Sequence, residues 1–249
     1  MAARPPTATV RLIDGFECRC DGDSIELPRG CQRLVAFIAL WERPVLRSFV
    51  SGNLWPDSDT ERANANLRST LWRLQADHRG FVVATGSHLT LGPGVAVDYR
   101  EAVTWSRTVL ANVGEPMPAT WTLHEINGLT REVLPDWYDD WVQLAQEGFR
   151  QLRLHALEAM CVQLAQGGRY CEALLAGLGA VAIEPLRESA HRRVIDVHLA
   201  EHNLVEALRQ YRSYESLLRN QLSLRPSAEL RQLVGSVMAG AGEVSTRTS

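Results

Sequence analysis

The sequence has 249 residues, of which 45% are hydrophobic and 22% are charged, and its formal net charge is −3. This composition is typical of a globular protein with enough apolar residues for one or two cores. The first ten residues contain no apolar segment of the kind found in secretory signals, and the most apolar run, 34–41, is far shorter than the roughly 18 residues of a membrane helix. We therefore expect a soluble, cytoplasmic protein without a membrane partner.

Cysteine and arginine usage adds two constraints. The five cysteines form an odd set without a CxxC pair, which argues against a disulfide framework or a zinc knuckle. All 26 basic residues are arginines, which we attribute to a GC-rich coding genome rather than to function. Between residues 29 and 79, eight arginines stand against five carboxylates, a local positive excess in a chain that is net negative.

The first hundred residues alternate strand and helix signals. The stretches 9–20 and 24–28 predict short strands around a turn at Asp-Gly-Asp, and 28–41 predicts a buried helix. A shorter helix is expected at 48–55, with Ser48 as a candidate cap. A long helix follows at 59–79, and 81–91 predicts a hairpin around Thr85-Gly86-Ser87. This order is typical of a winged helix-turn-helix with an N-terminal sheet.

The long helix has two unlike sides. At about 100° per residue, one side carries Ala63, Leu67, Thr70, Leu71, Leu74 and His78. The other sides mix arginine with amide, hydroxyl and indole groups, namely Arg62, Asn66, Arg68, Ser69, Trp72 and Arg73. Ser58, Asp59 or Thr60 can cap its start after Pro56. This mixture suits contact with a partner that is negatively charged and presents a pattern of hydrogen-bonding groups along an edge. The alternative is an ordinary solvated helix.

From residue 98 onward the sequence predicts only helices, at 98–111, 119–132, 136–166, 169–182, 187–201, 203–220 and 227–238. Glu172-Ala173-Leu174 aligns with Glu206-Ala207-Leu208, an offset of 34 residues. Gly177 and Ala180 then align with Tyr211 and Tyr214. This period, with small residues where paired helices meet, indicates tetratricopeptide-like packing, which commonly serves protein binding. The Gly/Ser/Thr-rich tail 239–249 is expected to be disordered.

The chain resembles the SARP family of actinobacterial transcription activators. The resemblance is carried by LWPDSDTERANANLRSTLWRL, by YRSYESLLRNQLSLRPSAEL and by VRLIDGFECRCDGDSIELPRGCQRLVAFIAL, and it covers about residues 10–238. It implies an α+β fold with an OmpR-type winged helix-turn-helix domain at 1–100, followed by an all-α, tetratricopeptide-like bacterial transcriptional activator domain at 101–238. The chain departs from the family pattern at the start of its recognition helix, where Ala63 and Ala65 offer little polar reach.

The resemblance also implies where DNA would bind. The family's positions for major-groove contact correspond to Asn66, Arg68, Ser69, Trp72 and Arg73 of this chain. Arg62 lies on the same outer side. Arginine can bind guanine O6 and N7, and asparagine can read adenine. Phosphate would meet Arg47, Ser48 and Trp55, and the wing would present Thr85, Ser87 and His88. The alternatives are a wing that is merely solvated and a Trp72 that packs against a neighbouring helix.

The implied function is activation of transcription. Two protomers would bind direct repeats upstream of promoters and recruit RNA polymerase through contacts that include the sigma factor, at antibiotic-biosynthesis genes. No cofactor, metal or enzymatic activity is expected, because Gly22-Asp23-Ser24-Ile25 lacks the partner residues of a GDS-type lipase, and His198 with His202 lacks a third metal ligand. The competing class is a tetratricopeptide-type scaffold that binds proteins and not DNA.

Overall fold

The computed structural model describes residues 8–77, 80–115, 121 and 123–246, and it divides into two compact units. The first unit comprises Met1–Thr104 and Arg131–Arg150, and the second comprises Trp105–Thr130 and Gln151–Ser249. The fold is a winged helix-turn-helix followed by a tetratricopeptide-like helical domain, as predicted. The sequence predicts that the segment 131–150 belongs to the helical half, but it packs with the first unit.

The first unit contains two small sheets. The four-stranded sheet has the order β3-β2-β1-β7, with β1 (Ala8–Arg11), β2 (Glu17–Cys20), β3 (Asp23–Ile25) and β7 (Ala96–Val97). The three-stranded antiparallel sheet has the order β4-β6-β5, with β4 (Val45–Leu46), β5 (Val82–Thr85) and β6 (His88–Leu91). The stretch predicted as one strand at 9–20 is therefore two strands. They separate at Asp14 and Gly15, both with positive φ, where a short acidic residue and glycine are tolerated best.

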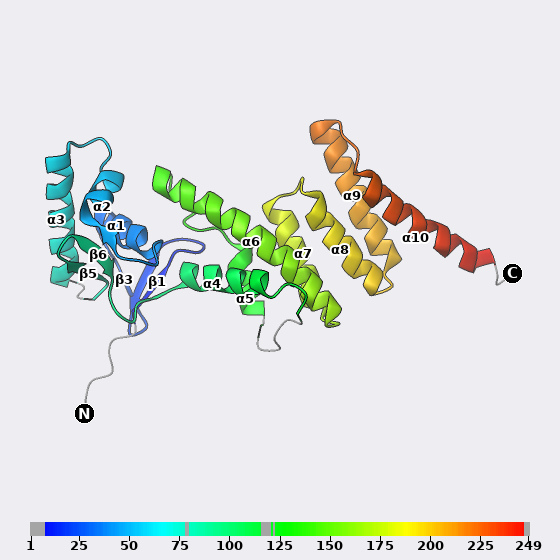
Figure 1. The fold of residues 1–249 in the computed structure, drawn as a ribbon, viewed down its shortest axis with the longest axis horizontal. Helices are drawn as coiled ribbons and strands as arrows, with labels where there is room; N and C mark the ends of the chain where they lie inside the picture. Colours follow the sequence, from blue (N-terminus) through cyan, green and yellow to red (C-terminus); the bar gives the residue numbers. More distant parts are fainter. Residues whose placement is uncertain (1–7, 78–79, 116–120, 122, 247–249) are drawn as a thin grey trace, which may run out of the picture. The chain divides into compact units, whose positions relative to one another are not determined.

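Three helices cover these sheets, α1 (Arg29–Ala39), α2 (Arg47–Leu54) and α3 (Thr60–Asp77), and α4 (Asp98–Ala111) leaves the first unit (Figure 1). Helix α1 buries every residue from Leu34 to Ala39. Arg100 of α4 closes its C-terminal end by donating to the carbonyl oxygens of Ile38, Ala39 and Trp41. Ser48 does not cap α2, because the helix begins at Arg47 and Ser48 lies in its first turn.

Asp98 joins the start of α4 to the end of β1. Its carboxylate accepts the backbone N–H groups of Leu12 at 2.8 Å, Ile13 at 3.1 Å and Tyr99 at 2.7 Å. Burial raises the pKa of the Asp98 carboxyl, and these three N–H donors oppose that shift. A single carboxylate therefore fixes where the strand ends and the helix begins.

The segment 131–150 completes the core of the first unit. Leu134 N–H donates to Leu12 O at 2.8 Å, and Ile13 and Val133 form an antiparallel bridge. Trp137 lies 5.7 Å from the Phe16 ring and under the Arg29 guanidinium at 4.0 Å, and Trp141 meets the buried Phe37 ring edge-on at 5.2 Å. The two tryptophans are thus core residues of a unit that lies mainly earlier in the chain.

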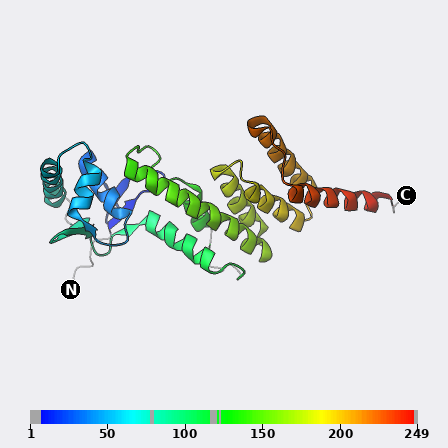
Figure 2. The ribbon, with the colours of Figure 1, turned by 45° about the horizontal axis from the view of Figure 1, so that its top comes forward.

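The second unit is all helical. It contains α5 (Leu123–Thr130), most of α6 (Asp140–Gln166), α7 (Tyr170–Ile183), α8 (Glu188–Ala200), α9 (Leu204–Leu222) and α10 (Ala228–Thr246). Helices α7, α8 and α9 pack in sequence, as the yellow-to-orange ribbons of Figures 1 and 2 show. Helix α10 continues to Thr246, past the predicted end at 238. Among the described residues, no helix combines the length and the apolar character that a bilayer crossing requires.

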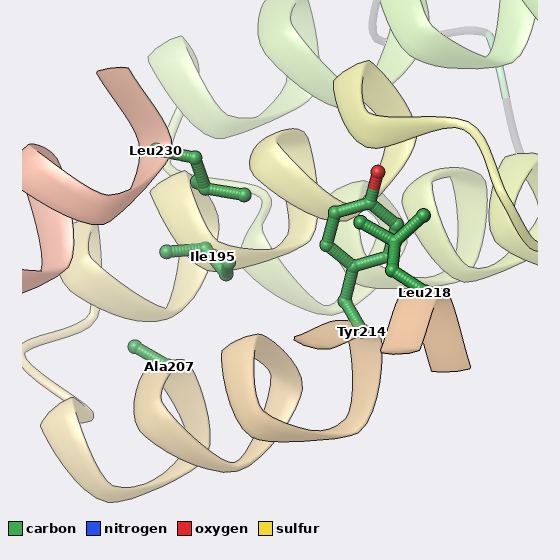
Figure 3. Close-up of a cluster of buried hydrophobic side chains, with 5 residues drawn as sticks. All are labelled: Ile195, Ala207, Tyr214, Leu218 and Leu230. Carbon is green, nitrogen blue, oxygen red and sulfur yellow. The ribbon is translucent and has the colours of Figure 1, made fainter. Parts of the chain in front are cut away.

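The predicted 34-residue relation places small residues where helices meet. Ala173 and Ala207 are both buried, and a Cβ added to Gly177 would lie 2.9 Å from Val194 Cγ2 and 3.1 Å from Cys161 Sγ. Ala207 belongs to a buried cluster with Ile195, Tyr214, Leu218 and Leu230, drawn as sticks in Figure 3. The repeat therefore marks the close approach of neighbouring helices.

His191 fixes the turn before α8 against α9. Its Nε2 lies 2.8 Å from Pro185 O, its Nδ1 lies 2.9 Å from Gln210 Nε2, and its ring stacks on Tyr214 at 4.2 Å. Burial lowers the pKa of His191, so the neutral ring is the favoured form in the folded protein. A neutral ring can donate from Nε2 and accept at Nδ1, which matches its two partners.

A chain that ends at residue 112 retains every candidate DNA-contacting residue but loses Trp137 and Trp141. We expect it to be less stable than a chain that ends at residue 150 by more than about 3 kcal/mol, because removing a buried tryptophan alone costs about that much. Chemical denaturation of both fragments measures the difference. Equal stability would show that the segment 131–150 is not part of this core.

Replacing Ala207 with leucine should destabilise the second unit by about 1–3 kcal/mol, because Ala207 is buried in a packed cluster and overpacking a core is destabilising. The matched control is Ala182→Leu on the exposed side of α7, where a change within about 0.5 kcal/mol is expected. Thermal melting of the two variants separates them. Indistinguishable melting curves would contradict the close packing of α9.

Candidate nucleic-acid interface

Helices α2 and α3 form the helix-turn-helix. Asp59 caps α3, since its carboxylate accepts the Arg62 N–H at 2.8 Å and its carbonyl accepts the Ala63 N–H at 2.9 Å. Ser51, buried on α2, donates to Asn64 Oδ1 at 2.9 Å and so holds the two helices together. The predicted start of the helix near residue 59 is confirmed, and of the three candidate caps Asp59 makes the capping bond.

The buried side of α3 is the predicted stripe. Ala63, Leu67, Thr70, Leu71 and Leu74 are all less than one-tenth exposed, whereas His78 lies outside the described residues. The Cys31 thiol of α1 donates to the carbonyl oxygen of Thr70 at 3.8 Å. The Thr70 hydroxyl donates to the carbonyl oxygen of Asn66. Burial of this stripe sets the rotation of the helix about its axis.

The opposite side of α3 faces outward. Trp72 is 71% exposed, so it does not pack against a neighbouring helix, the alternative that the sequence had left open. Arg62, Arg68, Ser69 and Arg73 are exposed as well, and Asn66 is half-buried. Within the described part of the chain, none of these three arginines forms an ion pair. The structure thus brings the predicted α3 residues together on one outward surface, which we call the α3 face.

The wing is the β5–β6 hairpin, which turns at Gly86 with a φ of +53°. Thr85 and Ser87 are exposed at its tip, and His88 is half-buried with Nδ1 at 3.1 Å from Ser87 Oγ. Arg47, at the start of α2, donates its backbone N–H to Ser87 O at 2.8 Å and reaches Gly86 O with its guanidinium at 3.5 Å. Arg47 and the wing tip therefore form one site, although 40 residues separate them in the sequence.

The remaining two predicted phosphate contacts are Ser48 and Trp55. Ser48 is exposed in the first turn of α2. Trp55 is half-buried at the end of α2, where it lines a cavity with Arg33 and Tyr138.

The region carries less free positive charge than its arginine count predicts, and Asn64 positions the helices without having been predicted. Arg29 lies over Trp137, Arg33 binds Asp139 Oδ1 through Nε at 3.0 Å, and Arg43 lies over Trp41 at 5.1 Å. Arg29 and Arg33 thus tie α1 to the segment 131–150, whereas Arg43 contacts a ring two residues away in the sequence. Asn64, which accepts the α2–α3 hydrogen bond, lies beside the predicted stripe. Its role depends on its partner Ser51 on another helix, so no local pattern in the sequence marks it.

No metal site emerges from the described residues, since none of their His, Cys, Asp and Glu side chains form a group of three suited to an ion. His198 and His202 do not share a helix, because α8 ends at Ala200 and His202 follows it with a φ of +58°. His198 is mostly buried rather than a surface residue, and its side chain is 14% exposed.

The fold and the α3 face define the class of the protein, a winged helix-turn-helix joined to a tetratricopeptide-like helical array. The family "Bacterial transcriptional activator domain" matches residues 106–238, more than half of the chain. The chain therefore belongs to this family of transcription activators, and the resemblance to SARP-type activators is confirmed.

A solved structure shares the whole architecture. The chain is similar to "Mycobacterium tuberculosis EmbR in complex with low affinity phosphopeptide" with a TM-score of 0.65 and 19% sequence identity, over 94% of this chain and 66% of the EmbR chain. The chain thus spans slightly less than two thirds of the EmbR length, and at this identity the match concerns the fold. None of the curated proteins matches the sequence.

Proposed function

We propose that the first unit binds double-stranded promoter DNA with the α3 face in the major groove. The observation that carries this proposal is the outward orientation of Arg68, Ser69, Trp72 and Arg73, opposite the buried leucine stripe. The major groove admits a helix, and exposed arginines without ion pairs can bind guanine or phosphate without first breaking another bond. Asn66, half-buried at the side of this face, would read adenine or position the helix in this proposal.

The wing supplies a second contact in this proposal. Arg47 and the backbone of the tip residues Gly86 and Ser87 form one cluster, which presents a guanidinium and hydroxyl groups to a phosphate backbone beside the groove. Thr85, Ser87 and His88 would follow the minor groove, and Ser48 would meet phosphate. Contacts of this kind position a protein on DNA and make its affinity depend on salt.

The helical unit would serve activation. Membership in the activator-domain family supports a role in transcription, and tetratricopeptide-like arrays offer extended surfaces for protein partners. We propose that two protomers bind direct repeats and that the helical unit recruits RNA polymerase, including its sigma factor, in the cytoplasm. The SARP resemblance suggests antibiotic-biosynthesis genes as targets.

The first test is Arg73→Ala in the full chain. Specific binding to promoter DNA should weaken by about 1–3 kcal/mol, because an exposed guanidinium that contacts DNA is lost while the fold stays intact. Fluorescence anisotropy over a series of salt concentrations measures the change. The matched control is Arg212→Ala, an exposed arginine of α9, which should bind DNA as the unaltered chain does.

Normal DNA binding by Arg73→Ala, with unaltered melting, would show that the α3 face is not the DNA-contacting surface. If the full chain itself shows no salt-dependent affinity for DNA upstream of neighbouring genes, the protein-binding scaffold becomes the better hypothesis.

The second test separates DNA binding from activation. A chain that ends at residue 150 keeps the complete first unit and should bind promoter DNA, more weakly if protomer contacts are lost. It should fail to stimulate transcription by purified polymerase, because most of the helical unit is missing. If this fragment saturates the promoter and activates as well as the full chain, the helical unit does not recruit polymerase.

A further inference from the structure

Two cavities lie within the first unit, each of about 450 Å³, a size within the range of small-molecule sites. The one that we call the aromatic pocket is formed by α1, α2 and the starts of α4 and α6. Its walls include Phe37, Trp41, Phe49, Tyr99, Trp141 and Leu144. Neither cavity contains a residue of the α3 face, and of the residues expected at DNA Trp55 alone is among the described residues that line them.

The aromatic pocket has ordered walls. The buried Phe37 ring lies 5.8 Å from Phe49, and Trp41 meets Phe49 edge-on at 5.6 Å. Phe49 is 42% exposed and Leu144 is 76% exposed, so large apolar side chains remain open to solvent at this pocket. Rings held edge-to-face around a space suit a flat aromatic group, which can adopt the same geometry.

The second cavity, which we call the acidic pocket, lies between the turn of the helix-turn-helix and the start of α6. Its walls contain three carboxylates, Asp57, Asp139 and Asp140. Arg33 also lines this pocket, and it is bonded to Asp139. Asp57 and Asp140 have no ion pair within the described part of the chain, so this pocket carries an excess of negative charge.

The two pockets adjoin, because Asn53 and Trp141 line both of them. Asn53 uses its amide N–H on Phe49 O at 2.8 Å, and among the described residues its Oδ1 receives no donor. Trp141 Nε1 is buried, and no acceptor for it lies among the described residues. The unused Asn53 Oδ1 therefore offers an acceptor where the apolar space meets the anionic one, whereas the Trp141 N–H, which is a donor, has no role toward an ammonium group.

We propose that the first unit binds a small aromatic amine, with its ring in the aromatic pocket and its ammonium group at Asp57 and Asp140. Stacking and burial would hold the ring, while the carboxylates would select the cation and Asn53 Oδ1 can accept from it. Of the described residues, no carboxylate lines the aromatic pocket, whereas three line the adjoining acidic pocket, so the ammonium group belongs in the acidic pocket.

Isothermal titration calorimetry of the full chain without DNA tests this site with three probes. Tryptamine should bind. Indole-3-propionate should bind at least about tenfold more weakly, because its side chain carries a negative charge on the same ring system. The amine n-butylamine should not bind, because it lacks the ring. Equal affinities for the two indoles, or no heat with tryptamine, would overturn the proposal. Because no DNA is present, the result is independent of the proposed DNA binding.

Substitutions then locate the site. Asp57→Asn with Asp140→Asn should weaken tryptamine about fivefold, since the ammonium loses two exposed charge partners, and should not weaken indole-3-propionate. Asp136→Asn, an exposed carboxylate outside both pockets, is the matched control and should change neither affinity. Equal effects of Asp136→Asn and of the double substitution would place the amine elsewhere.

Filling the aromatic pocket provides the complementary test. Ala145→Phe should abolish binding of both indoles, because the new ring occupies the space. If circular dichroism shows that this variant does not fold, Phe49→Ala removes a partly exposed wall instead and should weaken both indoles alike. Full affinity for tryptamine in the folded variant would overturn the proposal.

Discussion

Burial of one stripe of α3 is the constraint on which the rest of the first unit depends. Leu67, Leu71 and Leu74 are withdrawn from water, and Thr70 meets α1 at Cys31. Each buried leucine contributes roughly 1.5–3 kcal/mol, whereas the arginines on the other side gain little from the fold itself. The apolar stripe therefore fixes the rotation of the helix, and this rotation leaves Arg68, Trp72 and Arg73 facing outward. The proposed DNA contact follows from the packing.

The long, periodic elements could be predicted from the sequence, because their signals are local. The α3 stripe, the wing turn at Gly86 and the 34-residue relation around Ala173 and Ala207 all have a helical or turn periodicity that a short window shows. The two-residue strands β4 and β7 were missed, since two residues carry no periodicity. The assignment of 131–150 to the first unit was also missed, because it depends on the pairing of Val133 with Ile13 across about 120 residues.

The candidate site was predictable to the same extent. Which α3 side chains face outward follows from the wheel, but which arginines remain free does not. Arg29 and Arg33 are used by Trp137 and Asp139, partners more than 100 residues away in the sequence. The approach of Arg47 to the wing tip depends likewise on the pairing of β4 with β6. A local excess of arginine is thus a poor measure of binding capacity. In the structure, the arginines available for the proposed contact are those of the α3 face and Arg47.

The central claim, that the α3 face reads the major groove, is tested most directly by methylation interference. Promoter DNA methylated at guanine N7 would be sorted by binding to the full chain and to its Arg68→Ala and Arg73→Ala variants. Methylation of certain guanines should block binding of the unaltered chain. For each variant, methylation of at least one of these guanines should no longer affect binding, because the substituted arginine made the contact to that guanine. An identical interference pattern for all three proteins would contradict the claim.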